Sequence, residues 1–331
     1  MPLGLFVFHQ AGSKFVGFMP FFKEAPSSGA IQLQCSFGGI ITYSNLALRI
    51  SLPLSTSLKN RAKATRQTTL TNLINQMDSP EISGTDVIEW ACPLPSFGDL
   101  STSRVATLGL NPSNQEFEEK SGVELQGTSR RFPTLNSLGL QRWPEIDTQR
   151  LCLILESCRR YFLDNPYNKW FRPLNQVVLG TNTSFYDASR SACHLDLVPY
   201  ATSHKWTELT NGQRSSLLNI APKTLGLLLR DSPVRILILN GQSVVNQFER
   251  TAGISLERLD MPQWSLPRHS KPAVRGFAFT GVVHAMAGVT LDRPISVLGF
   301  NHNLQNSFGV TTKVVNSIRD WIADNTSLNG H

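Results

Sequence analysis

The sequence lacks the features that identify secreted, membrane and metal-binding proteins. None of its apolar runs reaches the roughly eighteen residues of a membrane-spanning helix, and no basic region precedes the short run Leu3–Phe8. The five cysteines form no CxxC pair and no Cys/His spacing suited to zinc. We therefore expect a cytoplasmic chain with reduced thiols, no metal or iron–sulfur cluster, and no membrane partner.

Motifs for nucleotide cofactors and serine hydrolases are also missing. Gly109 has neither the partner glycines of GxGxxG nor the lysine of GxxxxGK, and no GxSxG elbow occurs. The sequence therefore predicts no cofactor and disfavours serine hydrolase chemistry.

The charge of the chain is concentrated at one end. The net charge is +7, and residues 1–76 supply +6 of it, from seven Lys/Arg against the single acid Glu24. The remainder carries 24 basic and 23 acidic residues and is nearly neutral. A polyanionic partner therefore has to be inferred from local clusters rather than from the total.

Residues 1–76 differ from the rest in their scattered Phe, Ser and Gly and in having no clear helical period. We expect an N-terminal appendage ahead of a domain at 77–331. Two interpretations stay open: an accessory arm that contacts DNA, or a translated upstream region with Met77 as the real start.

From Met77 onward, strand and helix patterns alternate. Apolar runs that stop at Gly, Asn or Pro predict strands at 104–110, 193–198, 234–239, 276–283 and 295–300. Helical spacing predicts helices at 147–162, 217–229 and 311–323, and the aromatic segment 167–186 is expected to form an irregular wall. This alternation predicts an α/β three-layer sandwich with a mainly parallel central sheet.

Four predicted strands end in polar residues. These ends are Asn111 with Ser113, Asp196, Asn240 with Gly241, and the segment 301–308. Because parallel strands bring their carboxyl ends to one edge, these residues should converge on one cleft.

The segment Gly109-Leu110-Asn111-Pro112-Ser113 resembles the first motif of the uracil-DNA glycosylase superfamily, written GQDPY or GxNPG in its branches. Asp196, the segment 234–241 and the segment 301–307 resemble later pieces of that family, in the same order. The resemblance covers about Met77 to Ala323 and implies the fold of that superfamily.

The resemblance also implies a reaction, in which a nucleotide is flipped out of double-stranded DNA and its N-glycosidic bond is hydrolysed. Carried over by position, Asn111 would hold the attacking water. His302 would stabilise the charge on the departing base as a neutral donor, although Asn303-Leu304 replaces the family's HPS sequence. Since no lysine is placed for a Schiff base, a monofunctional enzyme that leaves an abasic site is expected.

Asp196 stands where uracil readers of the family have asparagine. An amide matches O4 and N3–H of uracil, whereas a protonated carboxyl matches the N4 amino group and the N3 acceptor of cytosine. Burial under a flipped base would favour that neutral acid. Asp196 therefore indicates cytosine, and its proton could assist departure of the base.

Ser113 stands where uracil-specific members carry a tyrosine that crowds the C5 edge of the base. Serine leaves that edge open, which indicates a cytosine with a substituent at C5. Such bases occur in the DNA of some bacteriophages, and the segment resembles anti-phage DNA glycosylases that excise glucosylated 5-hydroxymethylcytosine. The expected partner is therefore double-stranded phage DNA with modified cytosine.

Further residues are assigned by their place in these segments. Phe132, with Phe117 as runner-up, would stack on the base, although either could belong to the core. Leu304 would fill the gap left by the flipped nucleotide, and Trp170, Phe171, Tyr186 and Asp187 would line the wall beside C5. The predicted phosphate contacts are Asn303, Asn306, Ser307, Gly241, Gln242, Ser243, Arg130 and Arg131.

Two other functions remain open at this point. One is a repair glycosylase of the same fold that removes uracil or damaged uracil. The other, from a different class, is a catalytically inactive DNA-binding module that retains the cleft.

Overall fold

The computed structural model describes residues 5–10, 13–18, 33–34, 40–41, 52–187, 191–268, 272–305 and 309–327. Its contacts divide the chain into two units, Met1–Pro53 and Leu54–His331. In the first unit, β1 (Leu5–Gln10) pairs antiparallel with β2 (Ser13–Phe18), and β3 (Leu33–Gln34) pairs with β4 (Ile40–Ile41). All the chemistry described below lies in the second unit.

Helix α1 (Leu52–Met77) makes residues 54–76 part of the larger unit. Leu70, Leu73, Ile74 and Met77 are buried in one of its two apolar cores. Their spacing, i, i+3, i+4 and i+7, is that of one helix face. The expectation that 1–76 has no helical period is wrong for this stretch, and the division at Pro53 differs from the expected boundary at 76. A chain that began at Met77 would lose this core face.

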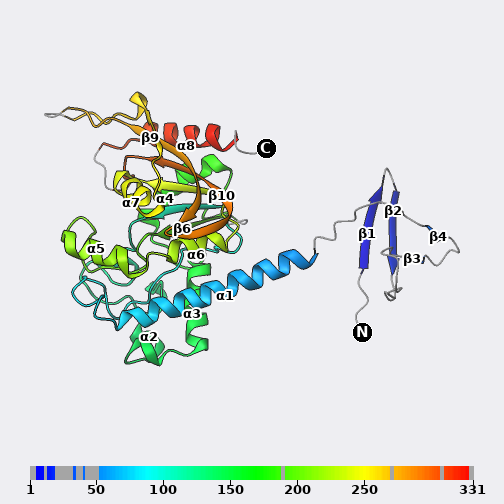
Figure 1. The fold of residues 1–331 in the computed structure, drawn as a ribbon, viewed down its shortest axis with the longest axis horizontal. Helices are drawn as coiled ribbons and strands as arrows, with labels where there is room; N and C mark the ends of the chain where they lie inside the picture. Colours follow the sequence, from blue (N-terminus) through cyan, green and yellow to red (C-terminus); the bar gives the residue numbers. More distant parts are fainter. Residues whose placement is uncertain are drawn as a thin grey trace. The chain divides into compact units, whose positions relative to one another are not determined.

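The central sheet has six strands in the order β6-β5-β7-β10-β9-β8. Three of them, β6, β10 and β9, are labelled in Figure 1. The first four, β6 (Ala192–Asp196), β5 (Val105–Gly109), β7 (Ile236–Asn240) and β10 (Val289–Phe300), are mutually parallel. Next to them, β9 (Phe277–Met286) pairs antiparallel with β10, and β8 (Glu257–Asp260) pairs antiparallel with β9. The prediction of a mainly parallel sheet is confirmed, and the carboxyl ends of four neighbouring strands share one edge.

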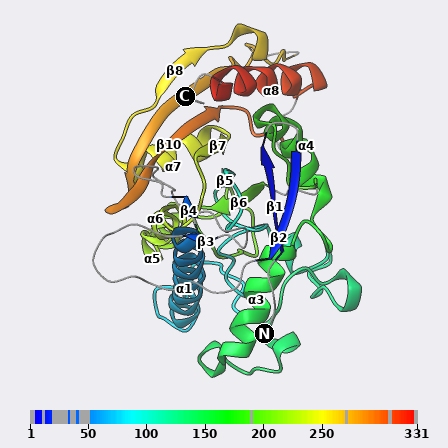
Figure 2. The same cartoon turned by 90° about the vertical axis from the view of Figure 1, so that its right-hand side faces the viewer.

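Helices pack against the sheet (Figure 2). Their buried side chains belong to two separate apolar clusters. One cluster includes side chains of α1, α3 (Thr148–Arg160), α4 (Asn168–Val178) and α8 (Thr312–Ser327). The other includes side chains of α6 (Thr224–Arg230) and α7 (Gln242–Ala252). Alternate strand residues serve the two clusters, for example Leu237 and Ile238 in β7, as expected for a sheet covered on both faces.

The remaining helices are short. They are α2 (Leu135–Leu138), α5 (Asn211–Ile220), and the 3₁₀ turns η1 (Asn114–Glu116), η2 (Gly127–Ser129), η3 (Trp143–Glu145), η4 (Leu179–Thr181) and η5 (Pro262–Trp264). No helix in the described residues is long and apolar enough to cross a membrane.

Three details of the expected secondary structure are wrong. The helix predicted at 217–229 is two helices, α5 and α6, because Pro222 lies between them and cannot continue a helix. The segment 167–186 begins with α4 rather than with irregular structure, even though Pro173 lies inside that helix. Strand β8 carries four exposed residues and therefore has no apolar pattern to reveal it.

Candidate functional site

Asn111 and Asp196 lie at the ends of two adjacent parallel strands. Asp196 is the last residue of β6 and pairs in register with Gly109 of β5, two residues before Asn111. Beyond the strands, backbone bonds from Leu197 N to Gly109 O (3.2 Å) and from Val198 N to Leu110 O (2.9 Å) keep the two segments together. The polar side chains at both strand ends are therefore held by regular sheet geometry, as the sequence predicts.

These residues line a cavity of about 50 Å³. Its other lining side chains are a second carboxyl group, an imidazole, three aromatic rings and two turn residues: Glu116, His194, Phe97, Trp170, Phe171, Pro112 and Ser113. At about 10–15 Å³ per water, this volume holds a few water molecules, so a larger ligand has to move the walls apart.

The Asp196 carboxylate is buried with only half of its hydrogen-bonding capacity used. Oδ1 lies 3.3 Å from His194 Nε2, and the Asp196 side chain is 2% exposed. Oδ2 is buried and has no hydrogen-bond partner among the described residues. A buried polar atom without a partner is costly, so this oxygen is available for a ligand in the cavity.

His194 positions Asp196 from the same face of the same strand. Its Nδ1 lies 2.7 Å from the Thr107 hydroxyl on the neighbouring strand, and its ring is 4.9 Å from Trp170 in an edge-on contact. With a proton on Nε2, the ring donates to Asp196 while Nδ1 accepts from Thr107. The imidazole thus connects the sheet core to the carboxylate in the cavity.

Gly109 makes room for this pair of side chains. A Cβ at this position would collide with Asp196 Oδ1 and would lie 3.0 Å from His194 Nε2. The glycine of the GLNPS segment is therefore required by a close approach across the sheet.

The Asn111 amide is held in one orientation. Its Nδ2 donates to Thr202 Oγ1 (2.9 Å) and to the carbonyl oxygen of Pro112 (3.1 Å). Thr202 has only one hydroxyl proton, which it donates to the His204 carbonyl (2.7 Å), so it has to accept from Asn111. The Asn111 nitrogen is therefore fixed against the protein, and Oδ1, which accepts no hydrogen bond from the described residues, can accept one from a ligand or water.

Glu116 brings a second carboxyl group to the cavity. It follows Ser113, whose hydroxyl caps the 3₁₀ turn η1 by accepting from Gln115 N (3.2 Å). The Tyr161 hydroxyl lies 2.8 Å from both carboxyl oxygens of Glu116, and Arg131 Nε lies 3.8 Å away. Burial raises the pKa of Glu116 to about 8, against the opposing effects of Tyr161 and Arg131, so the group is mostly uncharged at neutral pH.

The aromatic lining differs from the predicted one. Phe132 is buried against Tyr161, with ring centroids 5.1 Å apart and planes 7° from parallel, and Phe117 is buried beside it. The structure places both rings in the core rather than at the cavity. Phe97, which the sequence did not single out, lines the cavity together with Trp170 and Phe171. Tyr186, predicted for the same wall, packs against Phe162.

His302 is buried at 1% exposure at the end of β10. Burial lowers its pKa below the usual value, and its Nε2 lies 2.7 Å from the Trp264 carbonyl oxygen. A neutral imidazole ring has a single N–H, and in His302 this group donates its hydrogen bond to the Trp264 carbonyl oxygen. The ring therefore has no N–H left for a second acceptor, which a donor role toward a departing base would require.

The segment after β10 closes over the strand ends through hydrogen bonds. Leu304, the predicted wedge, is 8% exposed and packs in the core. Asn240 Nδ2 donates to Gln305 Oε1 (2.9 Å), and Gln305 Nε2 donates to the Trp170 carbonyl (2.9 Å). Asn303 Oδ1 accepts from Gln305 N (3.1 Å), while Asn306 and Ser307 lie outside the described residues.

Of the other predicted phosphate contacts, Gln242 and Ser243 at α7 face solvent, whereas Gly241 is buried. Gly241 precedes α7 with a φ of 103°, and Gln242 and Ser243 are exposed in its first turn. Arg131 is instead turned inward, where it donates to the Gln115 carbonyl (2.7 Å) and covers the Tyr167 ring at 5.6 Å. Arg130 is half-buried beside it.

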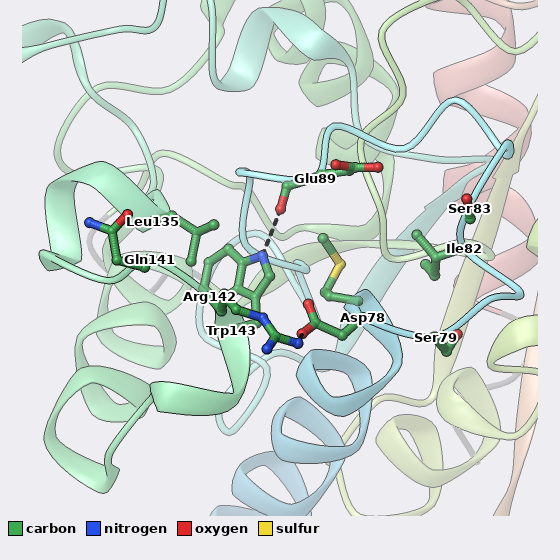
Figure 3. A pocket seen from close by; sticks show the side chains of 10 residues that line it. Asp78, Ser79, Ile82, Ser83, Glu89, Leu135, Gln141, Arg142 and Trp143 are labelled. Carbon is green, nitrogen blue, oxygen red and sulfur yellow. Dashed lines mark hydrogen bonds and ion pairs between the residues drawn. The ribbon is translucent and has the colours of Figure 1, made fainter.

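A larger hollow of about 370 Å³ lies between the end of α1 and the segment 135–143 (Figure 3). Its polar groups are largely occupied with each other. Arg142 pairs with Asp78 at 2.6 Å, and Trp143 Nε1 donates to the Glu89 carbonyl at 2.7 Å. None of the residues predicted to act on a substrate lines it.

No protein-family model matches the chain, and no curated protein matches it in sequence. Within the described residues, no group of three or more His, Cys, Asp or Glu side chains converges closely enough to hold a metal ion. The cavity itself is therefore the feature that points to a function, and two of its lining residues, His194 and Glu116, were not revealed by the sequence. His194 could have been found, because residues two apart on a strand share a face and it precedes Asp196 by two.

Proposed function

We propose that the chain is a monofunctional DNA glycosylase that excises a cytosine modified at C5, such as glucosylated 5-hydroxymethylcytosine of phage DNA. One observation carries the proposal: the Asn111 amide and the buried Asp196 carboxylate with its unpartnered Oδ2 meet in one cavity at the ends of adjacent strands. The four neighbouring parallel strands also fit the three-layer sandwich of the uracil-DNA glycosylase superfamily, whose first motif the GLNPS segment resembles.

In the proposed reaction, Asn111 Oδ1 accepts a hydrogen bond from a water molecule and directs its oxygen to the anomeric carbon. The C1′–N1 bond breaks, its electron pair leaves with the base, and the water oxygen bonds to C1′ and releases a proton to bulk water, from which the Asp196 carboxyl group is reprotonated after it has protonated the base. The fixed orientation of the amide supports this role, because Nδ2 is already bonded to Thr202 and Pro112. Positioning alone accounts for much of such an acceleration.

Asp196 would read the base and assist its departure. With a proton on Oδ2, that oxygen donates to N3 of cytosine while Oδ1 accepts from the N4 amino group, and transfer of the proton to N3 neutralises the departing base. His194, 3.3 Å from Oδ1, keeps the carboxyl group in this orientation. Because His302 has its N–H on Trp264, Asp196 takes the stabilising role that the resemblance assigned to His302.

The duplex would be held at the same sheet edge. The exposed first turn of α7 presents the side chains of Gln242 and Ser243 at the end of β7, and polar side chains at a helix N-terminus are suited to phosphate contacts. Since bases of this type occur in phage DNA, the reaction would serve antiviral defence.

A second candidate is a DNA-binding module without activity, which the small volume of the cavity, about 50 Å³, favours. One assay separates the candidates. Purified protein is incubated with duplexes that contain uracil, cytosine, 5-hydroxymethylcytosine or its glucosylated form, and abasic sites are detected by alkali. We expect strand breaks at the modified cytosines in the wild type and none in Asn111→Ala.

Cleavage of the uracil duplex alone would replace the proposal by a uracil repair enzyme. Binding of every duplex with no cleavage would favour the inactive module. Gln141→Ala, which changes an exposed side chain of the larger hollow, serves as the matched control and should cleave like the wild type.

A further inference from the structure

Glu116 is a buried carboxyl group in the cavity for which the proposed reaction has no use. It is 3% exposed, and it lines the cavity together with Asn111, Ser113 and Asp196. A carboxyl group in such a place needs either a full set of internal partners or a ligand.

The internal partners of Glu116 are too few. The Tyr161 hydroxyl accepts from Tyr167 N (2.8 Å), so its one proton points at Glu116 and is shared by two carboxyl oxygens at 2.8 Å each. Arg131 Nε is 3.8 Å away, and its NH1 is bonded to the Gln115 carbonyl. One shared proton and one distant cation leave hydrogen-bonding capacity on the side of the cavity.

The place of Glu116 in the chain decides which part of a substrate it faces. Glu116 belongs to the 3₁₀ turn that Ser113 caps, and its backbone N–H donates to the Ser113 carbonyl (3.0 Å). In the proposed function Asp196 holds the N3 and N4 edge of the base, and the small Ser113 leaves the C5 edge open. A substituent that extends from C5 past Ser113 therefore reaches the turn that carries Glu116.

We infer that Glu116 is a specificity residue that hydrogen-bonds a hydroxyl-bearing substituent at C5, such as hydroxymethyl or a hexose attached to it. This inference rests on the proposed function. An uncharged carboxyl group suits the task, because it has one O–H donor and one carbonyl acceptor, the same pair that a hydroxyl group offers. A methyl group at C5 would fill the space but leave Glu116 without a partner.

The test compares initial cleavage rates on duplexes that contain 5-hydroxymethylcytosine or 5-methylcytosine. Wild-type protein should prefer the hydroxymethyl base by about tenfold, which corresponds to about 1.4 kcal/mol, because the methyl base leaves the buried Glu116 unpaired. Glu116→Met keeps the length of the side chain but cannot hydrogen-bond, so the preference should disappear. Glu116→Gln keeps a donor and an acceptor and should retain most of it.

The matched control is Glu118→Gln, two residues further along the chain. Glu118 accepts a hydrogen bond from Asn114 Nδ2 (2.8 Å) and does not line the cavity. Its preference should equal that of the wild type. Equal wild-type rates on the two bases would overturn the inference and leave the proposed function standing, and this outcome does not depend on any variant folding. A Glu116→Met variant that slows both bases by the same factor would also overturn it, whereas absence of cleavage at every cytosine would instead overturn the proposed function.

Discussion

The two hollows of the larger unit differ in how their polar groups are satisfied. The hollow beside α1 has a volume of about 370 Å³, yet Asp78 pairs with Arg142 and Trp143 donates to Glu89, with only Ser79 Oγ buried and unpaired. The cavity at the strand ends has about 50 Å³, but it contains Asp196 and Glu116, two buried carboxyl groups with incomplete hydrogen bonding. Unpaired buried groups, more than volume, mark a site built for a ligand.

The supports of the two hollows differ as well. Asp196 and its neighbour His194 belong to β6, which pairs along its whole length with β5. The larger hollow is lined by the end of α1 and by turn residues that follow it. Side chains that are held by paired strands keep a precise geometry, and a catalytic site requires such precision. A hollow at the surface does not require it.

Among substitutions that compare the two hollows, Asn111→Ala should have the largest effect on cleavage. Loss of the water-holding amide should lower single-turnover cleavage by about 10²–10³-fold or more, while duplex binding by fluorescence anisotropy stays within about threefold. Gln141→Ala in the larger hollow should change neither quantity. If both variants lost activity equally, the cavity would not be the distinct site described here.

Gly109→Ala should have the next largest effect. The added Cβ collides with Asp196 Oδ1 and crowds His194, so the carboxyl group has to move. We expect cleavage to fall by about 10²-fold and the free energy of unfolding to fall by about 1–3 kcal/mol. Gly212→Ala is the control, because its Cβ would meet only Thr210 Oγ1 at 3.9 Å. We expect wild-type activity for it and a stability that is equal or up to about 1 kcal/mol higher, since alanine favours helix α5 more than glycine does.

The sequence predicts those cavity residues that regular strand periodicity places. It does not predict those that are placed by contacts with residues far away in the chain. The convergence of Asn111 and Asp196 follows from apolar runs that end at one edge of a parallel sheet, and these runs are visible in the sequence. Glu116 looks like one more acid in a polar loop. It becomes buried only because Tyr161, 45 residues away, reaches back to it.

The placements that the sequence did not anticipate have the same origin. Phe132 stacks on Tyr161 in the core, and His302 uses its N–H on the Trp264 carbonyl, and neither partner is near it in the sequence. The large apolar side chains that α1 buries within its described part, Leu70, Leu73, Ile74 and Met77, lie in its last turns, and the polar residues before them conceal the helical period.

A smaller effect concerns the pH dependence of stability. Burial raises the pKa of Glu116 from 4.5 to about 8, so the folded protein holds a proton that the unfolded chain releases. The contribution is fully present below about pH 4.5 and is lost as the pH rises toward 8, at about 1.4 kcal/mol per pH unit at most. Urea unfolding at several pH values should show this decline in the wild type relative to Glu116→Gln. Tyr161, Arg131 and Asp196 face the group and stay unchanged in both proteins.

The smallest effect is expected in the larger hollow. Arg142→Ala removes an ion pair with Asp78 whose arginine side chain is 69% exposed, and such pairs contribute about 0–1 kcal/mol. Stability should change within that range, and cleavage of modified DNA should not change at all. A marked loss of cleavage would show that this hollow contributes to the reaction.

The central claim is that the Asp196 carboxyl group selects cytosine, and the specificity of Asp196→Asn tests it most directly. Initial cleavage rates on uracil and 5-hydroxymethylcytosine duplexes are measured for the wild type and the variant, with melting temperatures to confirm that both are folded. An amide matches the uracil edge, so the ratio of uracil to modified-cytosine cleavage should rise by at least about tenfold in the variant. A variant that stays folded and active with the wild-type ratio would contradict the account.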